Sequence, residues 1–360
     1  MVDVTMNLEG RSVTSVVLTA AAVSFGVYST LSFVLLRKPH WWHKPLPKER
    51  QLPEIIRNVK VVGHRGSRLQ GLPENTIAAF KDAINSFKNV NGMIELDVWL
   101  SSDGEVLIHH DPTLERMCGE TALITDSHSK NLPAIKPYEG QKEKVGKWED
   151  VTEATRIPTF AEVLPHLPSD VPLIVEFKQL NVDLITKVHT LLEKHSRLPH
   201  QDGNTVWFSL TEEINIALHT FDPTVPRIRS AMKTIQLAFD YHTGLLPFRS
   251  LDNDCIFGVV ASKVDFARLR GMSGLKMLPD FVCHLLVFLF GGDPPKALLS
   301  KGMVNHLTKR GFPVMILDVN NEAQLDACVR CGATAVLTDA PSWIVTEHKP
   351  KLEALHTVTY

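Results

Sequence analysis

The 360-residue chain has few of the features that mark secreted or nucleic-acid-binding proteins. Its five cysteines are scattered and odd in number, which does not resemble the disulfide framework of a secreted domain and favours a reducing compartment. It contains no N-x-Ser/Thr glycosylation acceptor. Its formal net charge of -2 lacks the excess of Lys and Arg that a nucleic-acid partner requires. We therefore expect a globular protein without a nucleic-acid partner.

One long stretch near the N-terminus lacks charge altogether. Residues 12–36, "SVTSVVLTAAAVSFGVYSTLSFVLL", contain no charged side chain, and as a helix they exceed the ~20 residues that cross a bilayer. A cleaved signal peptide is the competing interpretation, but the stretch is long for one and no small-residue cleavage pattern ends it. We predict a transmembrane helix over 12–36, between an N-terminal tail of residues 1–11 and a basic, proline-containing linker of residues 37–58.

The residues that flank this stretch predict its orientation. Only Arg11 precedes it, whereas several basic side chains follow it: Arg37, Lys38, Lys44, Lys48 and Arg50. By the positive-inside rule, this asymmetry predicts that the C-terminal domain lies in the cytosol. Trp41 and Trp42 suit the headgroup layer, where an aromatic ring is partly hydrated.

From about residue 59 to residue 345, strand-like apolar runs alternate with helical patterns. The runs cover residues 58–64, 93–100, 171–178, 205–210, 312–319 and 333–339. This alternation and length predict a (β/α)8 TIM barrel, although the pattern does not place strands five and six between 222 and 300. Asn75 or Thr76 can cap the first helix, and Thr159 with Glu162 has capping-box spacing. Residues 346–360 form a C-terminal tail.

Three carboxylates fall on strand-like runs. Glu95 and Asp97 are two residues apart, so both project from one face of a strand, and Glu176 lies on the next run. Carboxylates that share a buried face repel one another unless a hard divalent cation such as Mg²⁺ or Ca²⁺ neutralises them. Two unrelated salt bridges explain each motif equally well when it is read alone.

Two histidines and two cations accompany the carboxylates. His64 and Arg65 follow the first run, His110 and Asp111 lie before a proline-started loop, and Lys178 follows Glu176. A lone histidine is usually a polar residue whose hydrogen bonds are satisfied by its neighbours. The strand ends of a barrel, however, converge on one rim, so these groups are expected to lie together. Together these groups suit cleavage of a phosphodiester, in which a metal and cations offset negative charge while an acid and a base move protons.

The motifs "HRG", "PENT", "ELDV", "HHDPTL", "IPTFAEVL" and "VEFK" resemble those of the glycerophosphodiester phosphodiesterase domain family, in the family's order. The resemblance covers roughly residues 60–345 and implies a TIM barrel with an insertion after the second strand, here residues 112–156. It implies that His64 and His110 are the acid/base pair and that Glu95, Asp97 and Glu176 bind one divalent cation.

The resemblance also implies supporting roles. Arg65 and Lys178 would hold phosphate, Glu74 and Asn75 would order the first loop, and Asp111 would orient its neighbour. The sequence departs from the family at the seventh strand, where many members carry a Trp before an Asn and this chain has Leu317, Asp318 and Asn320. An inward Asp318 would add charge near the glycerol or acyl pocket, and an outward one would matter little.

The apolar N-terminal stretch makes the chain similar to the membrane-anchored branch of the family, whose members are lysophospholipases D. This implies release of lysophosphatidic acid from lysophosphatidylcholine-like lipids, or of N-acylethanolamines from N-acyl lysophospholipids, at an endoplasmic reticulum or perinuclear membrane. Residues 281–290 are nearly all apolar and predict either an interfacial helix beside the active rim or an ordinary buried barrel helix.

We therefore expect a metal-dependent phosphoric diester hydrolase of the lysophospholipase D type. Two alternatives remain open at this point. The first is hydrolysis of water-soluble glycerophosphodiesters, with the membrane span serving location only. The second is an inactive barrel that acts as a membrane scaffold, against which the full catalytic set argues. The nucleophile is either water or a neighbouring glycerol hydroxyl.

Overall fold

The barrel consists of seven parallel strands and a short eighth segment that closes it. The computed structural model describes residues 6–7, 11–68, 71–136, 152–251, 256–260, 279–290 and 300–359. Seven parallel strands lie in the order β7-β6-β4-β3-β10-β9-β8. Their bounds are β3 (Val61–Gly63), β4 (Gly92–Leu100), β6 (Leu173–Phe177), β7 (Thr205–Phe208), β8 (Phe257–Val260), β9 (Val314–Leu317) and β10 (Ala335–Thr338).

The eighth position is short and explains why the sequence did not place it. Arg227 forms a parallel bridge with Trp207 of β7, and Ile228 forms one with Ile256, the residue before β8. These two residues close the gap between the ends of the sheet, so they are strand five and β8 is strand six. A strand of two bridged residues leaves no apolar periodicity to detect. The (β/α)8 prediction is confirmed.

The core has two layers, as a barrel requires. The helices that cover the outside of the strands are α3 (Ile77–Ser86), α6 (Val182–Lys194), α7 (Glu212–Phe221), α8 (Ala231–His242), α11 (Lys301–Lys309), α12 (Glu322–Cys331), α13 (Pro341–Glu347) and α14 (Lys349–Glu353). Inside the barrel, Val62, Met93, Ile174 and Met315 form a separate buried cluster. Ile56, from the short helix α2 (Glu54–Arg57), belongs to this cluster and covers the amino ends of the strands.

Both expected helix starts are observed. Thr76 begins α3 by accepting a hydrogen bond from the Ala79 backbone N–H at 3.2 Å. Thr159 and Glu162 form the reciprocal capping box at the start of α5 (Phe160–Val163). These caps satisfy backbone groups that a helix terminus otherwise leaves unpaired, and the cap of α3 fixes the loop that carries Glu74 and Asn75.

An excursion follows the second barrel strand. The strand β5 (Val106–Ile108) turns back antiparallel on β4, and the chain then forms α4 (Glu115–Cys118) and short 3-10 turns before α5. A third buried cluster, which includes Leu114, Met117 and Ile124, gives this segment its own core. Residues 137–151 of the expected insertion lie outside the described residues.

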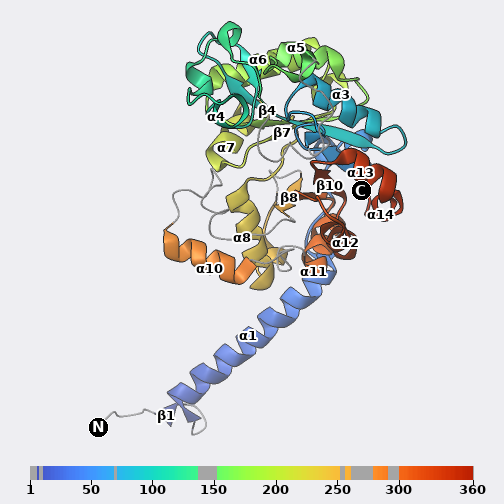
Figure 1. Cartoon of the computed structure of the whole chain (residues 1–360). Coiled ribbons are helices and arrows are strands. Elements are labelled where there is room, and N and C mark those ends of the chain that lie inside the picture. Colours follow the sequence, from blue (N-terminus) through green and yellow to red (C-terminus); the bar gives the residue numbers. More distant parts are fainter. Residues whose placement is uncertain are drawn as a thin grey trace.

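The apolar N-terminal stretch is one straight helix, α1 (Val13–Arg37), that projects from the body (Figure 1). It is long and apolar enough to cross a membrane. Its last turns are docked: the Tyr28 hydroxyl donates to the Thr243 carbonyl at 2.6 Å, and Ser32 donates to the Gly244 carbonyl at 2.8 Å. Only Val13 to about residue 27 therefore stands clear of the barrel.

The helix α10 (Asp280–Phe290) is not an ordinary buried barrel helix. Phe281, Leu285 and Phe288 are 72%, 50% and 85% exposed, while Cys283 is buried against the body. The exposed positions recur at i, i+4 and i+7, so they share one helix face. In Figure 1, α10 lies at the same lower edge of the body from which α1 projects.

Candidate active site

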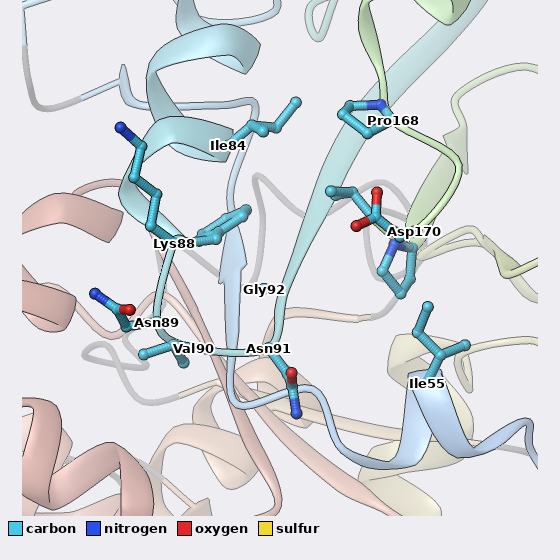
Figure 2. A pocket seen from close by; sticks show the side chains of 12 residues that line it. Ile55, Ile84, Lys88, Asn89, Val90, Asn91, Gly92, Pro168 and Asp170 are labelled. Atoms are coloured by element: carbon cyan, nitrogen blue, oxygen red, sulfur yellow. The ribbon is translucent and has the colours of Figure 1, made fainter.

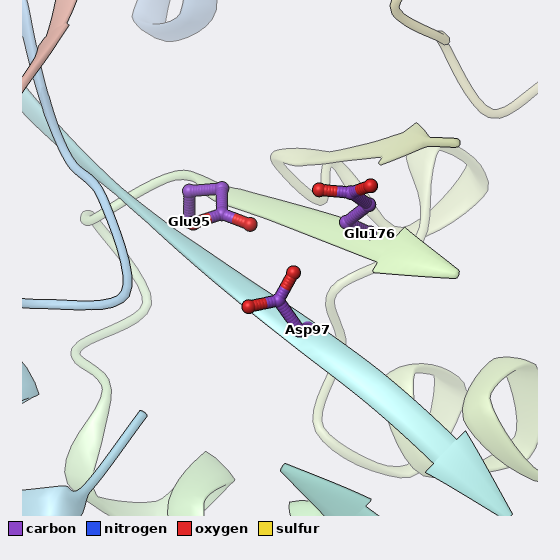
Figure 3. A group of neighbouring side chains, drawn as sticks. All are labelled: Glu95, Asp97 and Glu176. Atoms are coloured by element: carbon purple, nitrogen blue, oxygen red, sulfur yellow. The ribbon is translucent and has the colours of Figure 1, made fainter. Parts of the chain in front are cut away.

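The three predicted carboxylates meet at the barrel's inner face. Glu95 and Asp97 lie on β4, and Glu176 lies opposite Asp97 in the parallel register of β6. One oxygen from each lies within 4.8 Å of the others, and all three residues are buried. Figure 3 shows Glu95 and Asp97 from one strand and Glu176 from the next around a common space.

The electrostatics of this cluster fit a hard cation. Burial and the neighbouring Asp97 raise the pKa of Glu95 to about 8, and burial also raises the pKa of Glu176. Burial opposes ionisation of Asp97 as well, but Lys178 and His110 outweigh it and hold its pKa well below the usual range. Within the described part of the chain, Glu95 Oε1 has no hydrogen-bond partner. Three converging carboxylates and an unsatisfied oxygen match the oxygen ligands that Mg²⁺ and Ca²⁺ prefer.

Both predicted phosphate-binding cations line the same cluster. Lys178 Nζ lies 2.9 Å from Asp97 Oδ1 and 2.7 Å from Glu176 Oε1. Arg65 Nε lies 3.4 Å from Asp97 Oδ2, and the Arg65 backbone N–H donates to Glu95 at 2.9 Å. The Arg65 backbone has a left-handed φ of 55°, a strained conformation that these contacts fix. A cationic side chain thus lies beside Asp97 and Glu176, and a backbone N–H lies beside Glu95.

The predicted loop residues hold the cluster from one side. Asn75, also left-handed at φ 58°, donates from Nδ2 to Asp97 Oδ2 at 2.7 Å, and its backbone N–H donates to the Arg65 carbonyl. Glu74 is fully buried and accepts from Arg65 Nη1 at 2.9 Å. The loop is therefore ordered by contacts to the first and second strand ends.

His64 is held by an aspartate that the sequence analysis did not identify. Asp339, at the end of β10, lies 2.6 Å from His64 Nδ1 and is almost fully buried. Burial and Arg65 lower the pKa of His64, but the Asp339 carboxylate overcomes them, and the net change is upward. The first and last strands of a barrel are neighbours, so an aspartate at the end of the last strand was the available signal.

His110 is also held at Nδ1 by an aspartate, but its pKa is lowered rather than raised. Its Nδ1 lies 2.7 Å from Asp111 Oδ1, as the predicted orienting role requires. Burial, followed by the charge of Lys178, lowers the pKa of His110 to about 4. At neutral pH His110 is therefore a neutral base, whereas the upward shift in pKa makes His64 the easier of the two to protonate. Nδ1 is occupied in both rings, which leaves Nε2 for the reacting groups.

Two arginines missed by the sequence analysis join the two histidine pairs. Arg68 donates from Nη2 to Asp339 at 2.9 Å and from Nη1 to Glu74 at 3.4 Å. Arg116 donates from Nε to Asp111 at 2.6 Å and also binds Glu74. A continuous chain of ion pairs thus runs from one histidine to the other, with buried Glu74 at its centre. No local motif marks Arg68 or Arg116, because each joins its own loop to a residue on another: Arg68 to Asp339, and Arg116 to Glu74.

Asp318 faces the site. Its Oδ1 lies 3.9 Å from His64 Nδ1, and its backbone has a left-handed φ of 61°. Of the two orientations considered, the structure therefore shows the inward one. Asn320 lies deeper, where it donates to Asp339 Oδ2 at 2.8 Å and accepts from the Asp339 backbone N–H. The departure from the family's usual residues thus places a carboxylate, rather than an aromatic ring, beside His64.

A cavity of about 500 Å³ lies away from these groups (Figure 2). Gly92, which starts β4, and Pro172, which precedes β6, help to line it, so it opens at the amino ends of the strands. The carboxylates and histidines lie at the carboxyl ends, where barrel active sites are built. This cavity is therefore not part of the candidate active site.

Comparison with known proteins shows the family to which the chain belongs. A family model for the Glycerophosphoryl diester phosphodiesterase family matches residues 64–342, and the chain belongs to that family. It is a phosphodiesterase hydrolase with the family's TIM-barrel fold.

Among curated relatives, human lysophospholipase D GDPD1 is 29% identical over 321 residues, which cover 89% of this chain and 93% of the relative. Human lysophospholipase D GDPD3 is 26% identical over 331 residues, covering 91% and 95%. A phosphodiesterase structure from Oleispira antarctica, in complex with the product sn-glycerol-3-phosphate, superposes with a TM-score of 0.53 at 20% identity and covers 82% of this chain and 96% of that one. That structure supports the fold.

Proposed function

We propose that this chain is a membrane-anchored, metal-dependent lysophospholipase D. The observation that carries the proposal is the buried carboxylate cluster, flanked by two histidines that are each held at Nδ1 by an aspartate. This arrangement supplies an acid and a base beside a cation site, as hydrolysis of a phosphodiester needs. The similarity to two human lysophospholipases D supports a lipid substrate.

In the proposed mechanism the histidines divide the proton transfers. His110, whose pKa is lowered to about 4, removes a proton from the nucleophile, and His64 donates one to the departing head-group alcohol. Arg65 and Lys178 bind the phosphate oxygens. The nucleophile is water or a neighbouring glycerol hydroxyl; in the second case a cyclic phosphate forms first and is then hydrolysed.

Glu95, Asp97 and Glu176 would hold one Mg²⁺ or Ca²⁺ ion. When bound, such an ion acts as a Lewis acid that polarises the phosphoryl oxygens. The chain's own part is to place three carboxylates on two adjacent strands and to hold Asp97 ionised through Lys178 and Asn75. Glu74 keeps the first loop in place for this purpose.

Membrane anchoring is the second part of the proposal. We assign α1 as the anchor, residues 37–58 as the linker and residues 59–345 as the catalytic domain, which the basic residues after α1 place in the cytosol. An endoplasmic reticulum or perinuclear membrane follows from the family resemblance.

In chain order, α10 lies between β8 and α11, in a connection at the carboxyl ends of the strands. Its exposed Phe281 and Phe288 suit the acyl boundary beside the active rim.

The substrate is tested by comparing hydrolysis of lysophosphatidylcholine with hydrolysis of glycerophosphocholine. We expect the lysolipid to be preferred, with lysophosphatidic acid as the product. Several relatives are named glycerophosphodiester phosphodiesterase, which keeps the soluble diester as the second candidate function. Preference for glycerophosphocholine would reverse the order. If the protein is an inactive scaffold, neither lysophosphatidylcholine nor glycerophosphocholine will be hydrolysed, whichever divalent cation is added.

A further inference from the structure

A small cationic pocket lies where the chain leaves α1 and crosses the end of α11. Its volume is about 140 Å³, and its charged or titratable lining residues are His40, His43, Lys44, Lys309 and Arg310. No carboxylate is among the described residues that line it. Three basic side chains around one small space are suited to an anion, and Arg and Lys are the common ligands of phosphate.

Two of the lining side chains, His43 and Arg310, are held by hydrogen bonds. Pro247 O can only accept, so His43 Nε2, 2.8 Å away, carries a proton and donates to it. In the neutral ring Nδ1 then accepts from Arg310 Nη2 at 3.4 Å, and Arg310 Nη2 also donates to the Arg249 carbonyl at 3.0 Å. Lys44 and Lys309 are exposed at the mouth. One guanidinium held by hydrogen bonds and two exposed ammonium groups thus line a space of about 140 Å³.

The position along α1 indicates which phosphates are available. Counted from Val13, the ~20 residues that cross a bilayer end near Ser32, so the turns of α1 that Tyr28 and Ser32 dock on the body lie at the membrane boundary. Arg37 lies about 7.5 Å further along the helix. Lys309 Nζ donates to the Arg37 carbonyl at 3.3 Å, so the pocket lies at this level. Trp41 and Trp42 are 67% and 62% exposed beside it and mark a headgroup layer. The pocket therefore faces lipid headgroups.

The pocket is separate from the catalytic groups. Lys309, Arg310 and Gly311 precede the start of β9, so they lie at the amino ends of the barrel strands. The carboxylates and histidines lie at the carboxyl ends. In Figure 1, α11 and α10 both occupy the lower edge of the body, from which α1 descends. Contacts at α11 and at α10 would together fix how the barrel lies on the membrane.

We propose that this pocket binds the phosphate of an anionic phospholipid in the host membrane and thereby orients the barrel around α1. The proposal rests on the membrane anchoring put forward above. It assigns no catalytic role to the pocket. Binding at this point restricts rotation of the barrel about α1 and keeps the exposed face of α10 on the membrane.

The test uses the full chain reconstituted in phosphatidylcholine vesicles that contain a photoreactive phosphatidylserine. Labelled peptides are mapped by mass spectrometry. In the wild type we expect labelling of residues 40–46 and 309–311. A Lys44→Ala, Lys309→Ala double variant should lose labelling roughly 25-fold, because each lysine near a membrane contributes about fivefold. The matched control, Lys130→Ala with Lys194→Ala, removes two exposed lysines elsewhere and should be labelled like the wild type.

Unchanged labelling of the Lys44, Lys309 variant, or equal loss in the control variant, would overturn the proposal. Displacement of the lipid probe by millimolar inorganic phosphate would assign the pocket to free phosphate and overturn the lipid assignment. Hydrolysis of micellar lysophosphatidylcholine is measured on the same preparations and should not differ between the variants. If no preparation hydrolyses it while the labelling pattern is as expected, the proposed function fails and the lipid site stands.

Discussion

The contact between Asp339 and His64 provides a sharp test of the acid/base assignment. Asp339→Asn keeps the size of the side chain and removes the charge that faces His64 Nδ1 at 2.6 Å. A charge-assisted hydrogen bond is worth about 1.5–3 kcal/mol, and about 1.4 kcal/mol changes a rate tenfold. If the whole contribution stabilises the transition state, kcat/KM at neutral pH falls by about 10-fold to 100-fold. The carboxylate also raises the pKa of His64, so its loss moves the alkaline limit of activity to lower pH.

The matched control is Asp318→Asn. Asp318 Oδ1 faces the same nitrogen from 3.9 Å, beyond hydrogen-bonding distance, so its replacement should change kcat/KM by less than about threefold. The assay is the pH dependence of kcat/KM on lysophosphatidylcholine for both variants, with circular dichroism to verify folding. An Asp339→Asn enzyme with normal activity and an unmoved alkaline limit would refute the role given to this contact.

Three further predictions follow from the site and from α10. The wild-type pH profile should be bell-shaped: activity rises through about pH 4 as His110 loses its proton and falls above the raised pKa of His64, which kcat/KM measurements from pH 3 to 10 will check. Burial raises the pKa of Glu95 to about 8, so in chelator this carboxyl is protonated in the folded chain and ionised in the unfolded chain between about pH 4.5 and 8, and it contributes a fall in melting temperature as pH rises through that window. Glu95→Gln should reduce this fall and the stabilisation by added Mg²⁺ or Ca²⁺, as thermal melts will show; a pH dependence equal to that of the wild type would contradict the cluster's electrostatics. Phe281→Ser with Phe288→Ser should lower turnover on vesicles by about 10-fold and leave turnover of glycerophosphocholine unchanged, because the exposed apolar face is lost without touching the site; equal losses on both substrates would instead indicate a structural defect.

Much of the barrel could be predicted because its strands carry strong local patterns. The run that contains Glu95 and Asp97 is apolar on both sides of the carboxylates, and the caps at Thr76 and Thr159 mark helix starts. Strand five could not be found, because Arg227 and Ile228 form single bridges whose partners lie far apart in sequence. Its strand character comes from closure of the barrel and not from its own residues.

The sequence motifs located the residues that converge on the carboxylate cluster, but they did not reveal the residues that hold the two histidines and Glu74 in place. The positions of the three carboxylates follow from strand register, since Asp97 and Glu176 are opposite one another. Asp339, Arg68 and Arg116 were missed, because each joins loops that only the closed barrel brings together. The direction of Asp318 likewise depends on its left-handed backbone, which its sequence neighbours do not indicate.

The central claim is that the carboxylate cluster and the two histidines hydrolyse a lysophospholipid with the help of a divalent cation. The most direct test is a mass-spectrometric product assay of the full-length protein with lysophosphatidylcholine, in chelator and after addition of Mg²⁺ or Ca²⁺, alongside His64→Ala and Glu95→Gln variants. We expect lysophosphatidic acid and choline from the wild type only with the cation, and at least ~100-fold less from His64→Ala. Undiminished product in chelator, or full activity of both variants, would contradict the account.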